Sequence, residues 1–203
     1  LAFSPDGLRL VSGSVDGSVR IWDLGDSKFP ELVRFDGHAG EVTAVAFNSN
    51  ATQVISGAAN KTLKLWNSVD AVEVKDFAGH AGAIVGVAFG SGNQPVSASA
   101  DKTVRIWNPG NGQQVRAITA PQPLAAMAIT RDSARVAVAG TDKVVRVYQL
   151  SNGQPLASLE GHTSNVAGLA FSSDGARVVS TTAGNATTWD AATGRLLETV
   201  PVE

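Results

Sequence analysis

An aromatic residue that recurs at nearly constant intervals constrains the fold of this 203-residue chain more than any other feature. The residues are Trp22, Trp66, Trp107, Tyr148 and Trp189, at intervals of 44, 41, 41 and 41 residues. A hydrophobic residue stands 18 or 19 positions before each aromatic, at Phe3, Phe47, Phe89, Ile129 and Phe171. A Gly-His pair precedes three of the aromatics, at Gly37-His38, Gly79-His80 and Gly161-His162. Because three independent markers keep step, the chain is predicted to be an array of five repeated units.

Each unit is predicted to consist of four short β-strands. In Ser97–Asn108 an apolar run is followed by a polar turn and by a second strand, in which Val104 and Ile106 alternate with Arg105 and Trp107. Such alternation places consecutive side chains on opposite faces of a sheet. The same pattern predicts strands at Leu1–Phe3, Leu8–Ser12, Val19–Trp22, Leu32–Phe35, Val42–Phe47, Gln53–Ser56, Leu63–Trp66, Val72–Phe77, Ile84–Phe89, Pro95–Ser99, Val104–Trp107, Val115–Ile118, Leu124–Ile129, Arg135–Ala139, Val144–Tyr148, Leu156–Leu159, Val166–Phe171, Arg177–Ser180, Ala186–Trp189 and Leu196–Val200. Since no segment has a helical period, the fold class is predicted to be all-β.

Three units depart from the common pattern. In unit four, Ala120-Pro121 stands where other units have Gly-His, and in unit five the hairpin Thr181–Ala186 is one residue shorter and lacks its aspartate. In unit three, Gly90-Ser91-Gly92-Asn93 replaces a turn of the type Ser4-Pro5-Asp6-Gly7. No helix is expected after it to complete a phosphate-binding loop, so it is predicted to be a turn.

Taken together, these motifs resemble the WD-repeat β-propeller family over essentially all 203 residues. The resemblance is carried by Gly-His, by a strand ending in Ala-Phe, by Ser-Pro-Asp-Gly, and by the run from Ser12 to Asp23 that ends in Val-Arg-Ile-Trp-Asp. It implies one propeller region over residues 1–203 with four-stranded antiparallel blades at about 1–35, 36–77, 78–118, 119–159 and 160–203. Propellers contain about four to eight blades, and rings of this family most often resemble seven-bladed ones.

Five blades without a closing strand lead us to expect an incomplete or open ring. The chain is then a fragment of a longer, larger protein, and missing blades or self-association would cover the apolar faces at its ends. The alternatives are a genuine five-bladed ring or a self-associating arc.

The resemblance also implies that His, Ser or Thr, Asp and Trp of one unit form a buried hydrogen-bond chain. Unit three carries the full set, whereas Asn60 replaces the aspartate in unit two and is expected to be buried in a weaker network. The residues expected to take part are Ser12, Asp16, Trp22, His38, Ser56, Asn60, Trp66, His80, Ser97, Asp101, Trp107, His162 and Trp189. A catalytic Ser-His-Asp site would occur once, so recurrence at the repeat period favours a structural role. The three histidines lie one per unit and there is no cysteine, so neither a metal site nor a cofactor is expected.

The composition narrows the range of partners. The chain has 16 Lys and Arg against 18 Asp and Glu, a formal net charge of −2, and no basic stripe interleaved with aromatics. Nucleic acid is therefore not expected as the main partner. No apolar run is long enough for a membrane helix, so no membrane partner is expected. No signal peptide is apparent, which favours the cytoplasm while leaving the compartment open.

These observations predict a non-catalytic scaffold that binds another protein or a peptide. The resemblance places partner-contacting positions where each first strand begins and each second hairpin turns: Val15, Glu41, Ala59, Ala83, Ala100, Thr141 and Asn165. One alternative is a structural domain that positions an attached enzyme domain. The other is a propeller enzyme, which would need a non-repeating cluster of carboxylates, His or Arg near the central channel.

Overall fold

The computed structural model describes residues 1–202, which form five four-stranded antiparallel sheets. The strands are β1 (Ala2–Phe3), β2 (Arg9–Gly13), β3 (Val19–Asp23), β4 (Glu31–Phe35), β5 (Val42–Phe47), β6 (Gln53–Ala58), β7 (Leu63–Asn67), β8 (Glu73–Asp76), β9 (Ile84–Phe89), β10 (Pro95–Ser99), β11 (Thr103–Trp107), β12 (Gln114–Thr119), β13 (Leu124–Ile129), β14 (Arg135–Gly140), β15 (Val145–Gln149), β16 (Pro155–Leu159), β17 (Val166–Phe171), β18 (Arg177–Thr182), β19 (Asn185–Asp190) and β20 (Leu196–Pro201). Each sheet consists of four consecutive strands. The predicted all-β class and the predicted four-stranded units are confirmed.

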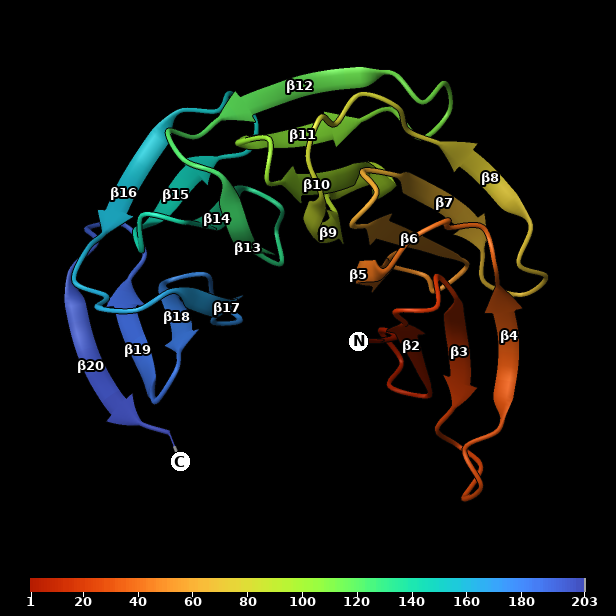
Figure 1. Ribbon diagram of the computed structural model, residues 1–203. Helices are drawn as coiled ribbons and strands as arrows, with labels where there is room; N and C mark the ends of the chain where they lie inside the picture. Colours follow the sequence, from red (N-terminus) through yellow and green to blue (C-terminus); the bar gives the residue numbers. More distant parts are fainter. Residues whose placement is uncertain (203) are drawn as a thin grey trace.

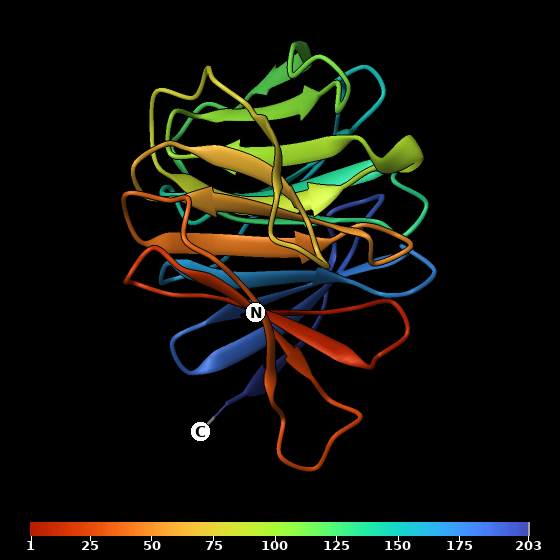
Figure 2. The ribbon, with the colours of Figure 1, turned by 90° about the vertical axis from the view of Figure 1, so that its right-hand side faces the viewer.

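The sheets stand side by side around an arc that does not close (Figure 1). The first strand of each sheet lies on the inside of the arc and the fourth strand lies on the outside, so each sheet is a blade. A gap separates the first blade, β1–β4, from the fifth, β17–β20 (Figure 1). Seen from the side, the blades are stacked edge-on, and the connecting loops gather on two opposite sides (Figure 2). The expectation of an open ring is confirmed.

The core is divided into four apolar clusters, one between each pair of neighbouring blades. Ile106 packs in the cluster with Tyr148 of the fourth blade, whereas the next residue, Trp107, packs in the cluster with Leu65 of the second blade. Consecutive residues of β11 therefore face opposite neighbours, as the alternation predicts. Both faces of an inner blade are buried, which explains why β6 and β10 are buried along most of their length.

From the second blade onward, the recurring aromatic packs against the preceding blade. Trp66 stacks on Phe35 of the first blade, with ring centroids 5.1 Å apart, and Trp107 lies 5.6 Å from Phe77 of the second. The pairing of the third and fourth strands shifts register just before this aromatic in all five blades. Such a bulge changes the direction of a side chain, and here it recurs wherever the aromatic stands.

The end blades have one face that no other blade covers. Phe3 of β1 is 68% exposed, whereas its counterpart Phe47 is 9% exposed. Trp22 is only half-buried, because no sheet of this chain precedes the first blade. At the other end, Leu196 and Val200 of β20 are exposed. The two ends of the arc therefore present apolar surface.

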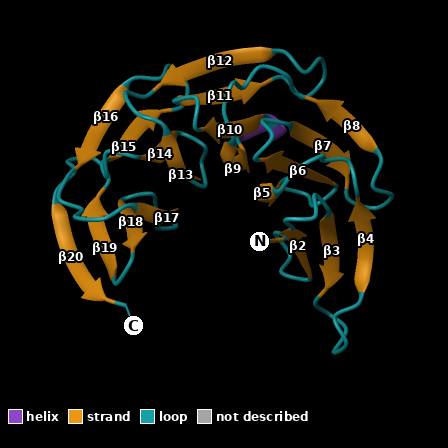
Figure 3. Ribbon diagram, viewed as in Figure 1, coloured by secondary structure: helices purple, strands orange, loops and turns teal. Residues whose placement is uncertain are grey.

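One hairpin differs from the predicted form, and one predicted turn contains a short 3-10 helix. The turn between β18 and β19 is only residues 183–184, so both strands extend into the segment Thr181–Ala186 that was predicted as the hairpin connection. The segment at Gly90–Asn93 forms a turn as predicted, and it contains a three-residue 3-10 helix, Ser91–Asn93, which is the purple segment in Figure 3. Within residues 1–202, no helix has the length and hydropathy needed to cross a membrane.

Candidate functional site

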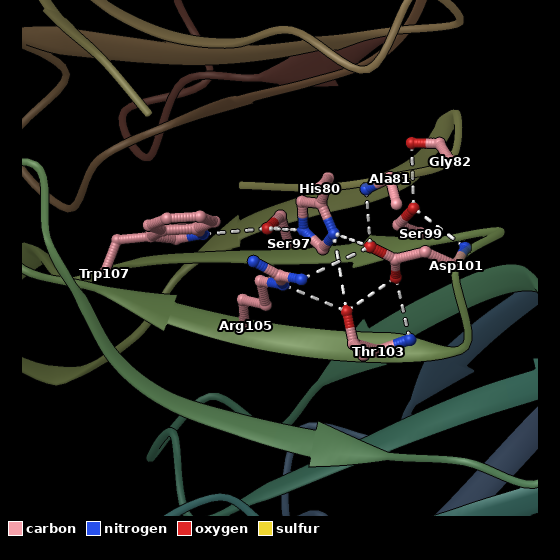
Figure 4. A network of polar contacts seen from close by, with 9 residues as sticks. All are labelled: His80, Ala81, Gly82, Ser97, Ser99, Asp101, Thr103, Arg105 and Trp107. Carbon is pink, nitrogen blue, oxygen red and sulfur yellow. Dashed lines mark hydrogen bonds and ion pairs between the residues drawn. The ribbon is translucent and has the colours of Figure 1, made fainter. Parts of the chain in front are cut away.

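A continuous hydrogen-bond chain crosses the third blade from its aromatic to a hairpin carboxylate (Figure 4). Trp107 Nε1 of β11 donates to Ser97 Oγ of β10 over 2.9 Å, and Ser97 Oγ lies 2.7 Å from His80 Nε2. His80 Nδ1 lies 2.8 Å from Asp101 Oδ2 in the β10–β11 turn. Because an indole only donates and a carboxylate only accepts, Ser97 donates to Nε2 and the Nδ1–H of His80 donates to Asp101.

Asp101 is held by more donors than the histidine alone. Its carboxylate accepts from the Ala81 amide at 3.0 Å, from the Thr103 amide at 3.0 Å and from the Thr103 hydroxyl at 2.6 Å. Burial alone would raise the pKa of Asp101, but the hydrogen bonds from Thr103, His80 and Ala81 outweigh it and hold the pKa well below its usual range. Ser97 and the His80 side chain have no exposed surface, so this pair lies out of reach of a substrate.

The second blade has the same hydrogen-bond chain from tryptophan to histidine, but the histidine Nδ1 has a different partner. Trp66 donates to Ser56 over 3.3 Å and His38 Nε2 lies 2.7 Å from Ser56, but His38 Nδ1 meets the hydroxyl of Thr62 at 2.7 Å. Thr62 in turn donates to Asn60 Oδ1 over 2.6 Å. The expectation that Asn60 is buried is wrong, because Asn60 is exposed and does not meet His38. The physical reason is that an amide has NH2 where Asp101 has its second oxygen, so Asn60 cannot accept a second N–H there.

The first and fourth blades contain only parts of the chain. Trp22 donates to Ser12 over 2.8 Å, but no histidine within residues 1–202 bonds to Ser12. Asp16, expected in a buried network, is exposed and bonds to Ser18 and Arg20. Trp22 is half-buried because no sheet covers this face of the first blade, whereas the hairpin position of Asp16 is also exposed in the second and fourth blades, at Asn60 and Asp142. In the fourth blade Asp142 binds Arg146, with a shortest distance of 2.6 Å.

The fifth blade keeps the buried half of the chain. Trp189 donates to Ser180 over 2.7 Å, and Ser180 Oγ lies 2.8 Å from His162 Nε2. Sequence reasoning missed Ser180 as a member of the network. The shortened hairpin was the signal, because it moves the serine to 9 residues before the aromatic instead of 10.

Acidification from pH 6.5 toward pH 4 is expected to destabilise the folded chain. Burial lowers the pKa of His38 from 6.5 to about 4, and the charge of Lys64 acts in the same direction. The unfolded chain therefore binds this proton at a higher pH, so the free energy of unfolding falls as the pH drops through this window and the His38 contribution levels off below about 4. Burial also lowers the pKa of His80 and of His162.

Thermal melts followed by circular dichroism between pH 7 and pH 4 measure this effect. The variant His38→Gln does not titrate and serves as the control, with a flatter pH dependence than the parent chain. A melting temperature that stays constant or rises on acidification would contradict the assignment of His38 as a buried neutral group.

The positions expected to contact a partner lie on one loop face of the arc. The Ala59 amide donates to the Glu41 carbonyl over 2.8 Å, and the Ala100 amide donates to the Ala83 carbonyl over 2.9 Å. The Thr141 amide donates in the same way to Pro123, a residue that sequence reasoning did not select, over 2.9 Å. We call this set the rim; its predicted members are Val15, Glu41, Ala59, Ala83, Ala100, Thr141 and Asn165. All are exposed or half-exposed, so the structure brings loop and hairpin residues together in pairs on an open surface.

A row of lysines beside the rim was also missed. Lys61, Lys102 and Lys143 occupy equivalent turn positions with φ of 74°, 75° and 66°. Lys102 Nζ reaches the Pro121 carbonyl at 3.3 Å, and Lys143 Nζ reaches the Thr163 carbonyl at 2.8 Å, each on the following blade. Their 41-residue spacing was the signal available in the sequence.

Known proteins resemble this chain in its repeats. The Pre-mRNA-processing factor 19 homolog 2 of Arabidopsis thaliana is 41% identical over 66 residues, which is 32% of this chain and 12% of that protein. The Ribosome biogenesis protein YTM1 of Eremothecium gossypii is 45% identical over 60 residues, 30% of this chain and 13% of that protein. The U5 small nuclear ribonucleoprotein 40 kDa protein of Pongo abelii is 37% identical over 62 residues, 30% of this chain and 17% of that protein. The matched segments thus span less than a fifth of these relatives.

The family described as "WD domain, G-beta repeat" matches residues 1–23, 29–67, 71–108 and 153–190. The segment 109–152, which contains most of the divergent fourth unit, lies outside these matches. The matches make up more than half of the chain, and they coincide with blades whose hydrogen-bond chains are described above. The chain therefore belongs to the WD40 family of WD-domain, G-beta repeat proteins.

Proposed function

We propose that this chain is a non-catalytic scaffold that binds a protein or peptide at the rim. One contrast carries the proposal. The reactive side chains Ser97 and His80 are buried and bonded to each other, and Asp101, whose side chain is 7% exposed, is bonded to His80. The rim residues, in contrast, are exposed or half-exposed. A rigid array with open loops is suited to recognition.

The same contrast argues against catalysis at the serines. Ser97 and Ser56 have no exposed surface, and each accepts a hydrogen bond from a tryptophan while it meets a histidine. A nucleophile must reach a substrate, and these two buried serines do not reach the surface. The same Trp-Ser-His arrangement is buried in both the second and the third blade, which supports a structural role.

The relatives suggest the kind of assembly. Their names refer to pre-mRNA processing, to a U5 ribonucleoprotein and to ribosome biogenesis. We propose that this chain contributes a protein-binding surface to a multi-component complex of that kind. A protein partner is favoured over RNA because the net charge is −2, and because two of the three lysines beside the rim, Lys102 and Lys143, are bonded to backbone carbonyls of the following blade.

Charge introduced on the rim tests the proposal. The variants Ala59→Arg and Thr141→Arg are expected to reduce recovery of partner proteins with the tagged full-length protein at least tenfold, because each places a large cation on the contact surface. The matched control Ala192→Arg is exposed in the β19–β20 loop, on the opposite loop face, and is expected to leave recovery unchanged. Quantitative mass spectrometry after affinity purification measures recovery, with thermal melts to show that all variants fold. Unchanged recovery with both rim variants would overturn the proposed surface.

A further inference from the structure

A small pocket lies in the fifth blade between the loop at Gly161-His162, the ends of β18 and β19 and the strand β20. The pocket has a volume of about 230 Å³, and its walls include Glu160, His162, Thr163, Thr182 and Asn185. It lies beside the two-residue turn at 183–184, whose shortness removes the position that carries Asp101 in the third blade. The fifth blade therefore has space in place of a carboxylate.

Two of the four donors that hold Asp101 have counterparts around this space. In the third blade, His80 Nδ1 and the Ala81 amide meet Asp101 at 2.8 and 3.0 Å. In the fifth blade, His162 and Thr163 stand at the matching positions after Gly161. Within residues 1–202, neither His162 Nδ1 nor the Thr163 amide has a hydrogen-bond partner, although His162 Nε2 is fixed on Ser180 at 2.8 Å.

The donor and acceptor order along the hydrogen-bond chain makes His162 Nδ1 a donor toward the pocket. Trp189 only donates, so the oxygen of Ser180 accepts from it. The serine hydroxyl has two acceptors within reach, and His162 Nε2 at 2.8 Å is nearer than the Thr187 carbonyl at 3.3 Å, so we assign the proton to the contact with His162. A neutral imidazole that accepts at Nε2 carries its proton on Nδ1. The pocket thus presents an N–H from a side chain and an N–H from the backbone, the pair that binds a carboxylate oxygen in the third blade.

Two charges nearby set the strength of this site. Lys143 of the fourth blade is bonded to the Thr163 carbonyl at 2.8 Å and favours an anion. Glu160 lines the pocket and opposes one. Because Glu160 is exposed, its repulsion is screened by solvent and reduces affinity without excluding an anion.

We propose that this pocket binds the carboxylate of an aspartate or glutamate side chain supplied by a partner protein. The partner would complete in the fifth blade the hydrogen-bond chain that Asp101 completes in the third. The claim that a partner protein supplies the carboxylate depends on the scaffold function proposed above. The claim that the pocket binds a carboxylate does not depend on it. The volume suits one side chain, so the site selects a single acidic residue at the edge of a larger interface.

Titration with acetate, followed by NMR, tests the pocket. Acetate is expected to shift the His162 ring nitrogens, the Thr163 amide and the Trp189 indole in a saturable manner. Acetamide, its uncharged counterpart, is expected to leave them unchanged. His38 and His80 are internal controls in the same spectra, because their Nδ1 atoms are already bonded to Thr62 and Asp101.

Isosteric charge variants sharpen the test. Glu160→Gln is expected to tighten acetate binding about threefold to tenfold, since it removes the opposing charge. Asn185→Asp places a carboxylate in the wall and is expected to weaken binding at least tenfold. His162→Phe keeps an aromatic ring beside Trp189 and is expected to abolish the response. Equal affinities in all four proteins, or equal shifts with acetamide, would overturn the proposal.

A final comparison identifies the source of the carboxylate. N-acetyl-aspartyl-methylamide is expected to bind at least as tightly as acetate, and N-acetyl-asparaginyl-methylamide is expected not to bind. If acetate binds but the aspartyl compound is excluded, the pocket takes a free small carboxylate and the protein ligand is wrong. Unchanged partner recovery in the rim variants together with acetate binding to the parent chain would mean that the scaffold proposal has failed and the pocket has not. Loss of recovery in the rim variants together with no acetate response would mean that the pocket has failed and the scaffold proposal has not.

Discussion

Replacing Trp107 with alanine is expected to lower the free energy of unfolding by about 3–5 kcal/mol. Trp107 is 1% exposed, packs on Phe77 of the second blade and donates to Ser97. The substitution leaves a cavity between two blades. It also removes the hydrogen bond that the indole N–H donates to the buried Ser97 oxygen. Such a loss is a large part of the roughly 5–15 kcal/mol that stabilises a typical domain. Urea denaturation followed by circular dichroism measures it.

Trp22→Ala is the matched control for that experiment. Trp22 makes the same indole bond, 2.8 Å long, to Ser12, but it is half-buried on the uncovered face of the first blade. The substitution is expected to lower the free energy of unfolding by about 1–2 kcal/mol, because the Trp22 side chain buries less apolar surface than the Trp107 side chain does. Equal losses for the two variants would show that burial between blades does not determine the stability of the arc.

The second large effect is expected at Asp101. Asp101→Ala should cost about 3–5 kcal/mol, because it removes the nearest acceptor from His80 Nδ1, whose side chain has no exposed surface, and the acceptor of the half-buried Thr103 amide. The Asp101 side chain is 7% exposed, so water does not readily replace it. Urea denaturation again gives the free energy of unfolding.

Two comparisons test the reason for the loss at Asp101. Asp101→Asn should cost less, because the Thr103 hydroxyl already lies 3.4 Å from His80 Nδ1 and can take the role that Thr62 has in the second blade. Asn60→Ala, at the equivalent exposed position, is expected to cost under about 1 kcal/mol. If Asn60→Ala is as damaging as Asp101→Ala, the buried donors are not the source of the effect.

The sequence was sufficient for the architecture because the repeat is encoded in strongly apolar and aromatic positions. Trp66 and Trp107 must be buried, and a 41-residue period between them leaves room for four short strands. The open form of the ring followed from five units and the absence of a closing strand. Each of these inferences depends on local pattern, which survives without knowledge of the three-dimensional contacts.

The details of the hydrogen-bond chains were less predictable. Asn60 and Asp101 occupy the same place in the repeat, but one oxygen replaced by NH2 redirects His38 to Thr62. Ser180 was displaced by a single deletion, and the pairing of rim residues depends on backbone bonds between separate loops. Such outcomes depend on the direction of each donor, which a residue type at a given spacing does not specify.

The central claim is that the five blades form an arc with two uncovered ends and do not form a closed ring. Small-angle X-ray scattering coupled to size-exclusion chromatography gives the mass and the shape of the chain in one measurement. The account predicts either a monomer with the elongated distance distribution of an open arc or a higher mass produced by association of the ends, where Phe3 and Leu196 are exposed. A monomer with the compact distance distribution of a closed five-bladed ring would contradict it.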